Sequence, residues 1–369
     1  MQPVGQDTGL FETGHWGKAM NFTYNALPSR VIFGAGQRTQ VKAELERLGI
    51  ERALVLSTAD QSATGAEFAA MIGDRVGAIY PGAVMHTPVE VTESAMHQME
   101  QMNCDGILSV GGGSTIGLGK AIAYRTDLPQ LVVPTTYAGS EMTPILGQTE
   151  KGLKTTLRSP KVLPETVIYD PELTLTLPDF ITGPSGMNAI AHAVEALYAE
   201  DANPIISMMA EASIKALSVA LPVLMKDGSN MGARENAAYG AWLAGACLGS
   251  VGMAIHHKIC HTLGGTFDLN HADVHCLMIP YSTAYNREAA PQAMAAISRA
   301  LGGQDAAAGL FDLLQSVGRQ KSLAEMGMTE TSLDRAAELA VQNPYYNPHP
   351  VTQKGVREML QAAFEGRQP

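Results

Sequence analysis

The sequence predicts an α/β domain over residues 21–180, built on a parallel sheet of the Rossmann-like, nucleotide-binding class, followed by an all-α domain over residues 181–369. Short apolar runs alternate with helix-like segments through the first half, which is typical of a parallel sheet covered on both faces. After Leu175 the chain becomes rich in Ala and Met, with apolar residues three and four positions apart. That period is helical. An active site is expected in the cleft between the two domains.

Length and composition are consistent with this division. A chain of 369 residues suits two domains. Apolar residues make up 46% and charged residues 17%, without an apolar run long enough to predict a membrane span. The net charge of −11 argues against a nucleic-acid surface, which needs a clustered basic face.

Cysteine usage and the first residues indicate the compartment. The four cysteines form neither a CxxC pair nor an evenly spaced framework, and the start of the chain lacks a basic segment followed by an apolar one. A cytoplasmic protein with reduced thiols is therefore expected. Residues 1–20 are polar and Gly-rich without periodicity, and they predict a disordered extension with Met20 as an alternative start.

The elements of the first domain follow from runs of apolar residues and from helical periodicity. Strands are predicted at 21–26, 30–36, 53–58, 77–82, 106–110 and 128–136. Helices are predicted at 42–50, at 65–73, from Thr92 to Asn103, and through Lys120.

The second domain is predicted to be helical throughout, with Asp, Asn, Ser or Gly at the helix boundaries. The helical segments are 188–200, 203–228, 234–265, 291–303, 306–318, 332–342 and 353–366. The nineteen methionines are most simply flexible core residues.

A glycine-rich loop follows the buried strand that ends at Val110. Gly111, Gly112 and Gly113 allow the backbone to approach a diphosphate, and the helix that starts at Ser114 offers free amide donors. The alternative is a tight strand-to-helix turn without a ligand. The loop lacks the GxGxxG fingerprint.

A hydroxyl-rich loop over residues 134–141 follows the next strand. Thr135, Thr136 and Ser140 could contact ribose and phosphate oxygens, or could simply cap a turn. Two such loops at the ends of neighbouring strands favour a nucleotide.

Histidines gather in the second domain. His257 and His261 are four residues apart on one helix, His192 follows Asn188 by the same spacing, and His271 comes after an expected break at Gly264–Gly265. Buried histidines satisfied by hydrogen bonds are one explanation. A Zn²⁺ or Fe²⁺ site is another, although position 188 supplies an amide where a carboxylate would be usual.

From Asn21 onward the chain resembles the iron-containing alcohol dehydrogenase family, which has a dehydroquinate-synthase-like fold. The resemblance rests on an ordered set of motifs. These are GAG at 34–36, GGGS at 111–114, PTTYAGSE at 134–141, NAIAHAVE at 188–195, and the histidines at 257, 261 and 271.

The departures from the family pattern indicate a particular branch. The resemblance implies that the family's metal ligands match Asn188, His192, His257 and His271, so the usual aspartate is here an asparagine. The aspartate expected three residues after the GGGS serine is Gly117. These features are similar to the maleylacetate reductase branch, whose members work without a metal, and no metal is expected in this chain.

The resemblance also implies a cofactor. NAD-specific relatives have an acidic residue where this chain has Thr58, so NADPH is expected to be accepted beside NADH. Lys154 matches a lysine that approaches the nicotinamide ribose, and His261 matches the histidine nearest the nicotinamide.

The substrate expected from the branch is maleylacetate, a small dianionic enone. His192, His257, His261 and His271, with Asn188, are the candidate catalytic residues, because they could polarise the ketone and supply a proton.

Two further residues are candidates for binding the substrate. Arg158 could bind a carboxylate through its planar guanidinium, or could be an ordinary surface arginine. Tyr137 is the second candidate.

Two other functions stay open at this point. One is an alcohol dehydrogenase in which Asn188 still helps to bind Fe²⁺ or Zn²⁺, and the other is a nucleotide-binding protein without catalysis. By resemblance, a homodimer is expected.

Overall fold

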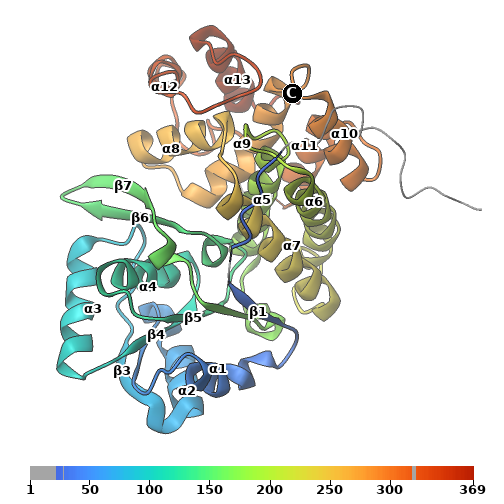
Figure 1. Cartoon of the computed structure of the whole chain (residues 1–369). Helices are drawn as coiled ribbons and strands as arrows, with labels where there is room; N and C mark the ends of the chain where they lie inside the picture. The colour runs from blue at the N-terminus through green and yellow to red at the C-terminus, as the bar shows by residue number, and fades with distance from the viewer. Residues whose placement is uncertain (1–21, 28, 318–320) are drawn as a thin grey trace, which may run out of the picture.

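The computed structural model describes residues 22–27, 29–317 and 321–369. The predicted disordered extension, residues 1–20, lies outside them. Figure 1 shows an α/β part that carries the sheet and a helical part that follows it in the chain.

The sheet has six parallel strands among the described residues, in the order β1-β8-β5-β4-β2-β3. The strands are β1 (Arg30–Phe33), β2 (Ala53–Leu56), β3 (Val76–Tyr80), β4 (Gly106–Gly111), β5 (Gln130–Pro134) and β8 (Thr166–Tyr169). Because β4 and β5 are neighbours, the loops that follow them lie at the same edge, as the sequence predicts.

Helices cover both faces of this sheet. They are α1 (Val41–Arg47), α2 (Ser62–Ile72), α3 (Val89–Gln101) and α4 (Gly113–Thr126). Val55 and Leu108 pack in one core with residues of α1 and α2, whereas Leu54 and Ile107 pack in another with residues of α3 and α4. Strands buried on both faces explain their continuous apolar runs.

The α/β part differs from the prediction in three places. One is strand β8, because residues 166–169 were not among the predicted strands. Residues 22–26 form no strand, and Phe22 and Tyr24 are 45% and 41% exposed. A hairpin of β6 (Ile145–Glu150) and β7 (Leu153–Arg158) was not predicted, because its polar sequence lacks a clear alternation.

The helical part surrounds α5, which packs against α6, α7 and α9. Its helices are α5 (Asp179–Ala196), α6 (Pro204–Leu224), α7 (Met231–Ser250), α8 (Ile255–Phe267), α9 (His271–Tyr285), α10 (Pro291–Ala300), α11 (Ala306–Val317), α12 (Ser332–Ala340) and α13 (Gln353–Glu365). Helix α6 is long and apolar enough to cross a membrane, as is the bent pair α7 and α8, but α6 packs here against α5, α7 and α10.

Three predictions about the helices were wrong. The single helix expected over 234–265 is two helices, α7 and α8, that meet at 96°. The expected break at Gly264–Gly265 lies inside α8, and the segment after it, which contains Pro280, forms the unpredicted helix α9. The bend places the histidines of α8 and α9 against α5.

Candidate active site

Three helices bring the predicted histidines together. His192 comes from α5, His257 and His261 from α8, and His271 from the first turn of α9. The ring centroids of His192 and His257 are 5.2 Å apart, those of His257 and His261 are 6.0 Å apart, and those of His261 and His271 are 6.3 Å apart. Asn188 lies one turn before His192 on α5 and is buried.

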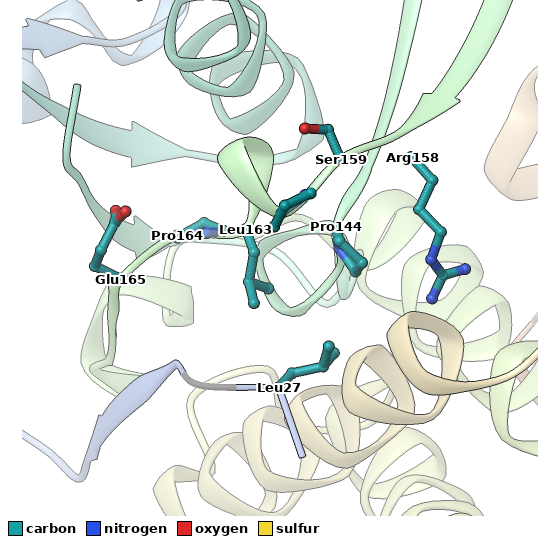
Figure 2. A pocket seen from close by; sticks show the side chains of 8 residues that line it. Leu27, Pro144, Arg158, Ser159, Leu163, Pro164 and Glu165 are labelled. Carbon is teal, nitrogen blue, oxygen red and sulfur yellow. The ribbon is translucent and has the colours of Figure 1, made fainter. Parts of the chain in front are cut away.

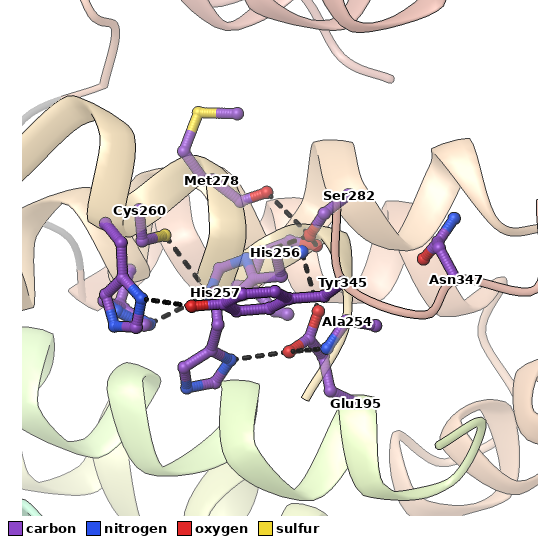
Figure 3. Close-up of polar contacts among 12 residues, drawn as sticks. Glu195, Ala254, His256, His257, Cys260, Met278, Ser282, Tyr345 and Asn347 are labelled. Atoms are coloured by element: carbon purple, nitrogen blue, oxygen red, sulfur yellow. Dashed lines mark hydrogen bonds and ion pairs between the residues drawn. The ribbon is translucent and has the colours of Figure 1, made fainter. Parts of the chain in front are cut away.

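Glu195 connects α5 to the start of α8. Its carboxylate is fully buried and accepts hydrogen bonds from the amides of Ala254 (2.9 Å) and His256 (2.6 Å), which begin that helix. It also accepts one from His257 Nδ1 at 2.6 Å (Figure 3). Glu195 thereby caps the helix and fixes the tautomer of His257, leaving Nε2 as the second nitrogen of that ring.

Several buried polar atoms of the cluster lack a hydrogen-bond partner in the described part of the chain. They are Asn188 Oδ1, His192 Nδ1 and His257 Nε2. Burial lowers the pKa of His192 well below its usual value, with the nearby His257 as a further cause. A buried polar atom without a partner costs about 1–3 kcal/mol. These atoms are therefore suited to a ligand that forms hydrogen bonds with them.

The outer side of the cluster is open to solvent. His261 is exposed, and its Nδ1 lies 3.2 Å from the hydroxyl of Tyr345, which follows α12. Lys258 Nζ lies 6.0 Å from the centre of the Tyr345 ring. Tyr345 could not be selected from the sequence, because it comes from a distant loop.

Two more histidines belong to the cluster, although the sequence did not assign them a role. His256 and His275 are fully buried, with His256 Nε2 3.0 Å from His275 Nδ1. Cys260 Sγ lies 3.6 Å from the same His256 nitrogen, and Ser282 Oγ lies 3.0 Å from His256 Nδ1. The concentration of histidines in this segment was the only available signal.

The glycine-rich loop has the close packing that a phosphate site requires. Gly111 has a φ of 154°, and a Cβ there would lie 2.4 Å from Thr115 Oγ1. A Cβ at Gly112 would lie 2.8 Å from Thr136 Cγ2, whereas a Cβ at Gly113, the first residue of α4, would lie 3.9 Å from Ala138 Cβ, an ordinary van der Waals distance. Ser114 follows in the first turn of α4. The start of α4 is thus accessible to an anion.

Hydrogen bonds at the backbone and at the side chain of Thr135 fix the start of the hydroxyl-rich loop. Thr135 N donates to Gly111 O at 3.1 Å, and Gln61 Nε2 donates to Thr135 Oγ1 at 2.9 Å. Thr136 is half-buried next to Gly112, and Ser140 begins the short 3-10 helix Ser140–Met142.

Lys120 fixes the second half of this loop. Its ammonium is buried and donates to the carbonyls of Ser140, Thr143 (2.7 Å) and Ile145 (2.9 Å). Burial lowers the pKa of Lys120 to about 7, and the carboxylate of Glu141 opposes this shift.

Other predicted cofactor residues lie nearby in the fold. Thr58 follows β2, which pairs with β4, and is half-buried. Lys154 lies on β7 opposite Thr149. Their contacts with a cofactor stay predictions.

The two predicted substrate-binding residues form hydrogen bonds with residues other than the predicted histidines. Arg158 Nη2 donates to Gly249 O and lines a cavity of about 370 Å³ (Figure 2). The cavity is lined by Leu27, Pro144, Arg158, Ser159, Pro160, Leu163, Pro164 and Glu165. None of the predicted histidines is among these residues, so the role of Arg158 as a carboxylate ligand has no support from its position.

Tyr137 is buried and hydrogen-bonded within the protein, and its contact with a substrate stays a prediction. It is 1% exposed, and its hydroxyl lies 3.2 Å from Thr174 Oγ1 and accepts from Arg234 Nη1 at 3.1 Å. The ring therefore packs between the two parts of the chain, with its hydroxyl already bonded.

Comparison with known proteins identifies two family models. Residues 28–171 match the model described as iron-containing alcohol dehydrogenase, and residues 182–364 match the model for the C-terminal part of the same family.

Individual relatives cover nearly the whole chain. A maleylacetate reductase from a Rhizobium species is 52% identical over 94% of this chain and 99% of its own length. The crystal structure of maleylacetate reductase from Agrobacterium tumefaciens is 52% identical and covers 95% of this chain and 100% of its own, with a TM-score of 0.93. A solved 1,3-propanediol oxidoreductase is 27% identical, with coverage of 94% and 100% and a TM-score of 0.87.

Proposed function

Because this chain belongs to the iron-containing alcohol dehydrogenase family, we propose that it is a maleylacetate reductase that uses NADH or NADPH to convert maleylacetate to 3-oxoadipate. The near full-length identity to several enzymes of that name supports the substrate. The observation that carries the proposal is the buried set of Asn188, His192 and His257, whose polar atoms without a partner in the described part of the chain leave hydrogen-bonding capacity for a polar substrate.

The glycine-rich loop supports the use of a dinucleotide. Side chains at Gly111 and Gly112 would clash with Thr115 and Thr136, so glycines are needed where the backbone leads into the amide donors at the start of α4, which suit a diphosphate. Thr135, Thr136 and Ser140 then offer hydroxyls to the same ligand. The nicotinamide, when bound, supplies a hydride.

The reaction places specific demands on the histidines. Addition of hydride to the alkene carbon β to the ketone converts maleylacetate to an enolate, and a proton at the α carbon completes 3-oxoadipate. Donor groups at Asn188, His192 and His271 would stabilise the enolate oxygen as an oxyanion hole does. His257 donates from Nδ1 to Glu195, so Nε2 of the neutral ring accepts a hydrogen bond. An imidazole among the catalytic histidines would supply the proton.

We propose that no metal takes part. None of the side chains at the four positions that match the family's metal ligands carries a carboxylate, and the nearby Glu195 carboxylate is occupied by three hydrogen bonds. A divalent ion there would lack the negative ligand that normally offsets its charge. The four side chains thus offer a divalent ion no charged ligand, and no step is assigned to a metal.

One observation favours a metal-dependent alcohol dehydrogenase as the second candidate. In many metal sites, the imidazole nitrogen that does not bind the metal donates a hydrogen bond to a carboxylate. His257 Nδ1 donates to Glu195 in the same way.

The test combines turnover with metal analysis. Purified protein is assayed with maleylacetate and NADH or NADPH before and after exhaustive chelation, while bound iron and zinc are measured. We expect the same turnover in both samples. No turnover, or turnover proportional to bound metal, would contradict the proposal.

The protein is further proposed to be a homodimer. Phe22 and Tyr24 are exposed in the segment before β1, and β1 is an edge strand of the sheet. Pairing with a second copy would cover both features. Light scattering would measure the mass in solution, and a monomer would contradict the proposal.

A further inference from the structure

His275 lies within the histidine cluster, although neither the motif nor the matched metal positions include it. Its ring centroid is 4.3 Å from that of His271, 4.8 Å from that of His257 and 6.3 Å from that of His192. The ring of His275 is therefore nearer to that of His257 than the ring of His261 is, because the centroids of His257 and His261 are 6.0 Å apart.

The two nitrogens of His275 have different surroundings. Nδ1 is 3.0 Å from His256 Nε2, whereas Nε2 is buried and has no hydrogen-bond partner in the part of the chain that the structure describes. Because the two nitrogens of an imidazole point in nearly opposite directions, Nε2 points away from His256. This atom joins Asn188 Oδ1, His192 Nδ1 and His257 Nε2 as a fourth buried polar atom without a partner.

The hydrogen bonds behind His275 allow two neutral arrangements with the same number of protons. In one, Ser282 donates to the carbonyl of Met278 (3.1 Å), His256 donates from Nδ1 to Ser282 Oγ, and His275 donates from Nδ1 to His256. His275 Nε2 is then a bare acceptor. Burial lowers the pKa of both histidines well below the usual value, which favours neutral rings.

In the other arrangement the two hydrogen bonds of His256, to Ser282 and to His275, are reversed. Ser282 donates to His256 Nδ1, and His256 Nε2 donates to His275 Nδ1, so that His275 Nε2 carries the hydrogen. Met278 O loses the hydrogen bond from Ser282, but α9 continues for a turn beyond it and supplies a backbone donor. A ligand with an anionic oxygen would favour this second arrangement, because a donor facing an anion forms a strong hydrogen bond.

We propose that His275 is a substrate-binding residue whose Nε2 donates a hydrogen bond to an anionic oxygen of the substrate, and that His256 and Ser282 are positioning residues that allow this tautomer. The identity of the anion, a carboxylate or the enolate oxygen of maleylacetate, rests on the proposed function. The proposal deepens that function by adding a donor that the family motif does not contain.

Two substitutions at His275 separate binding from packing. Gln places its amide nitrogen near the position of Nε2, whereas Asn places its nitrogen near Nδ1 and so retains a contact with His256. We expect His275→Asn to raise KM for maleylacetate about ten- to hundredfold, the effect of losing a hydrogen bond to a charged group. KM for NADH should change by less than about twofold, and His275→Gln should retain most of the affinity.

A purely structural role predicts the opposite order. Because Asn would keep the bond to His256, it would then be the milder substitution, and that result would overturn the proposal. No increase in KM in either variant would overturn it as well. Thr283→Ser is the matched control, since Thr283 is buried on the same helix and its hydroxyl donates to the carbonyl of Ile279, a bond that serine keeps.

A second measurement does not depend on turnover. In protein labelled with ¹⁵N-histidine, addition of maleate as an unreactive dianion should move the His275 Nε2 resonance from the unprotonated to the protonated range, and Nδ1 in the other direction. The signal is assigned by its loss in His275→Gln. An Nε2 that stays unprotonated in the presence of maleate would overturn the proposal. Failure of the wild type to reduce maleylacetate would contradict only the proposed function.

Discussion

At the scale of single residues, Glu195 contacts both the start of α8 and the ring of His257. It caps α8 and orients His257 through one carboxylate. Glu195→Gln replaces one acceptor oxygen by an NH₂ group that faces amide donors. We expect kcat/KM to fall about ten- to hundredfold, as is usual when a group that orients a functional histidine is removed.

The same variant should also be less stable. An unsatisfied buried group costs about 1–3 kcal/mol, so the free energy of unfolding in urea should decrease by that amount. Activity that is unchanged at equal protein concentration would contradict the orienting role of Glu195.

Asn188 allows a direct test of the charge argument. Asn188→Asp restores a carboxylate beside His192, so affinity for Zn²⁺ or Fe²⁺ should rise while maleylacetate turnover falls, because the added charge repels a dianion. Asn188→Ala is the control, since it removes the amide without adding charge. It should lower turnover and leave metal affinity low. Metal binding that is the same in the Asp variant and the wild type would contradict the charge argument.

Residues of the candidate site could be predicted from the sequence where they belong to a motif. His192, His257, His261 and His271 could be selected from spacing and resemblance, and the structure brings them together. His275 could not be selected, because its contact with His256 depends on how α8 and α9 pack.

At the scale of elements, Lys120 holds the hydroxyl-rich loop against α4. Lys120→Met leaves the carbonyls of Ser140, Thr143 and Ile145 without this donor. We expect the free energy of unfolding to decrease by about 2–4 kcal/mol. NADH affinity, measured by fluorescence titration, should also weaken.

An exposed lysine provides the comparison for Lys120. Lys42 pairs with Asp74 on the surface, and Lys42→Met should change stability by less than about 1 kcal/mol. A destabilised Lys120 variant with normal NADH affinity would show that the loop does not contact the nucleotide.

Gly117 illustrates how a departure from a motif is accommodated. A Cβ at this position would lie 2.4 Å from Thr87 Oγ1, and Thr87 itself has an unusual φ of 46°. Gly117→Ala should therefore destabilise the protein by about 1–3 kcal/mol through overpacking. Combining it with Thr87→Ala should remove much of that cost in a double-mutant cycle of urea unfolding. Strictly additive effects would contradict this contact.

The sequence predicted most elements of the sheet and most helices, since buried strands and amphipathic helices carry strong periodic signals. It did not predict the bend between α7 and α8. The cause of the bend is not local, because the amides at Ala254 and His256 bond to Glu195, some sixty residues earlier in the chain. The β6–β7 hairpin was missed because its strands are polar and partly exposed.

At the scale of the whole molecule, buried histidines make stability depend on pH. Burial lowers the pKa values of His192, His256 and His275, whereas an unfolded histidine titrates near 6.5. Above about pH 6.5 both states are neutral at these positions. As the pH falls below that value, only the unfolded chain takes up protons, so stability decreases by up to about 1.4 kcal/mol per pH unit for each histidine.

Urea unfolding of the metal-free protein at pH 7.5, 6.5 and 5.5 would measure this slope. His275→Gln removes one of these titrating groups and should make the slope smaller by up to about 1.4 kcal/mol per pH unit. Equal slopes in the variant and the wild type would contradict a neutral, buried His275.

Glu195 accepts hydrogen bonds both from the start of α8 and from His257, so the folding of that helix end and the orientation of the histidine depend on the same carboxylate. Opening of the turn at Ala254 breaks the contacts that start α8 and, through the same carboxylate, frees the ring of His257. Such opening needs less free energy than global unfolding. Mild heating or dilute denaturant is therefore expected to inactivate molecules whose sheet and remaining helices are still intact, so that enzyme activity reports the integrity of this one junction.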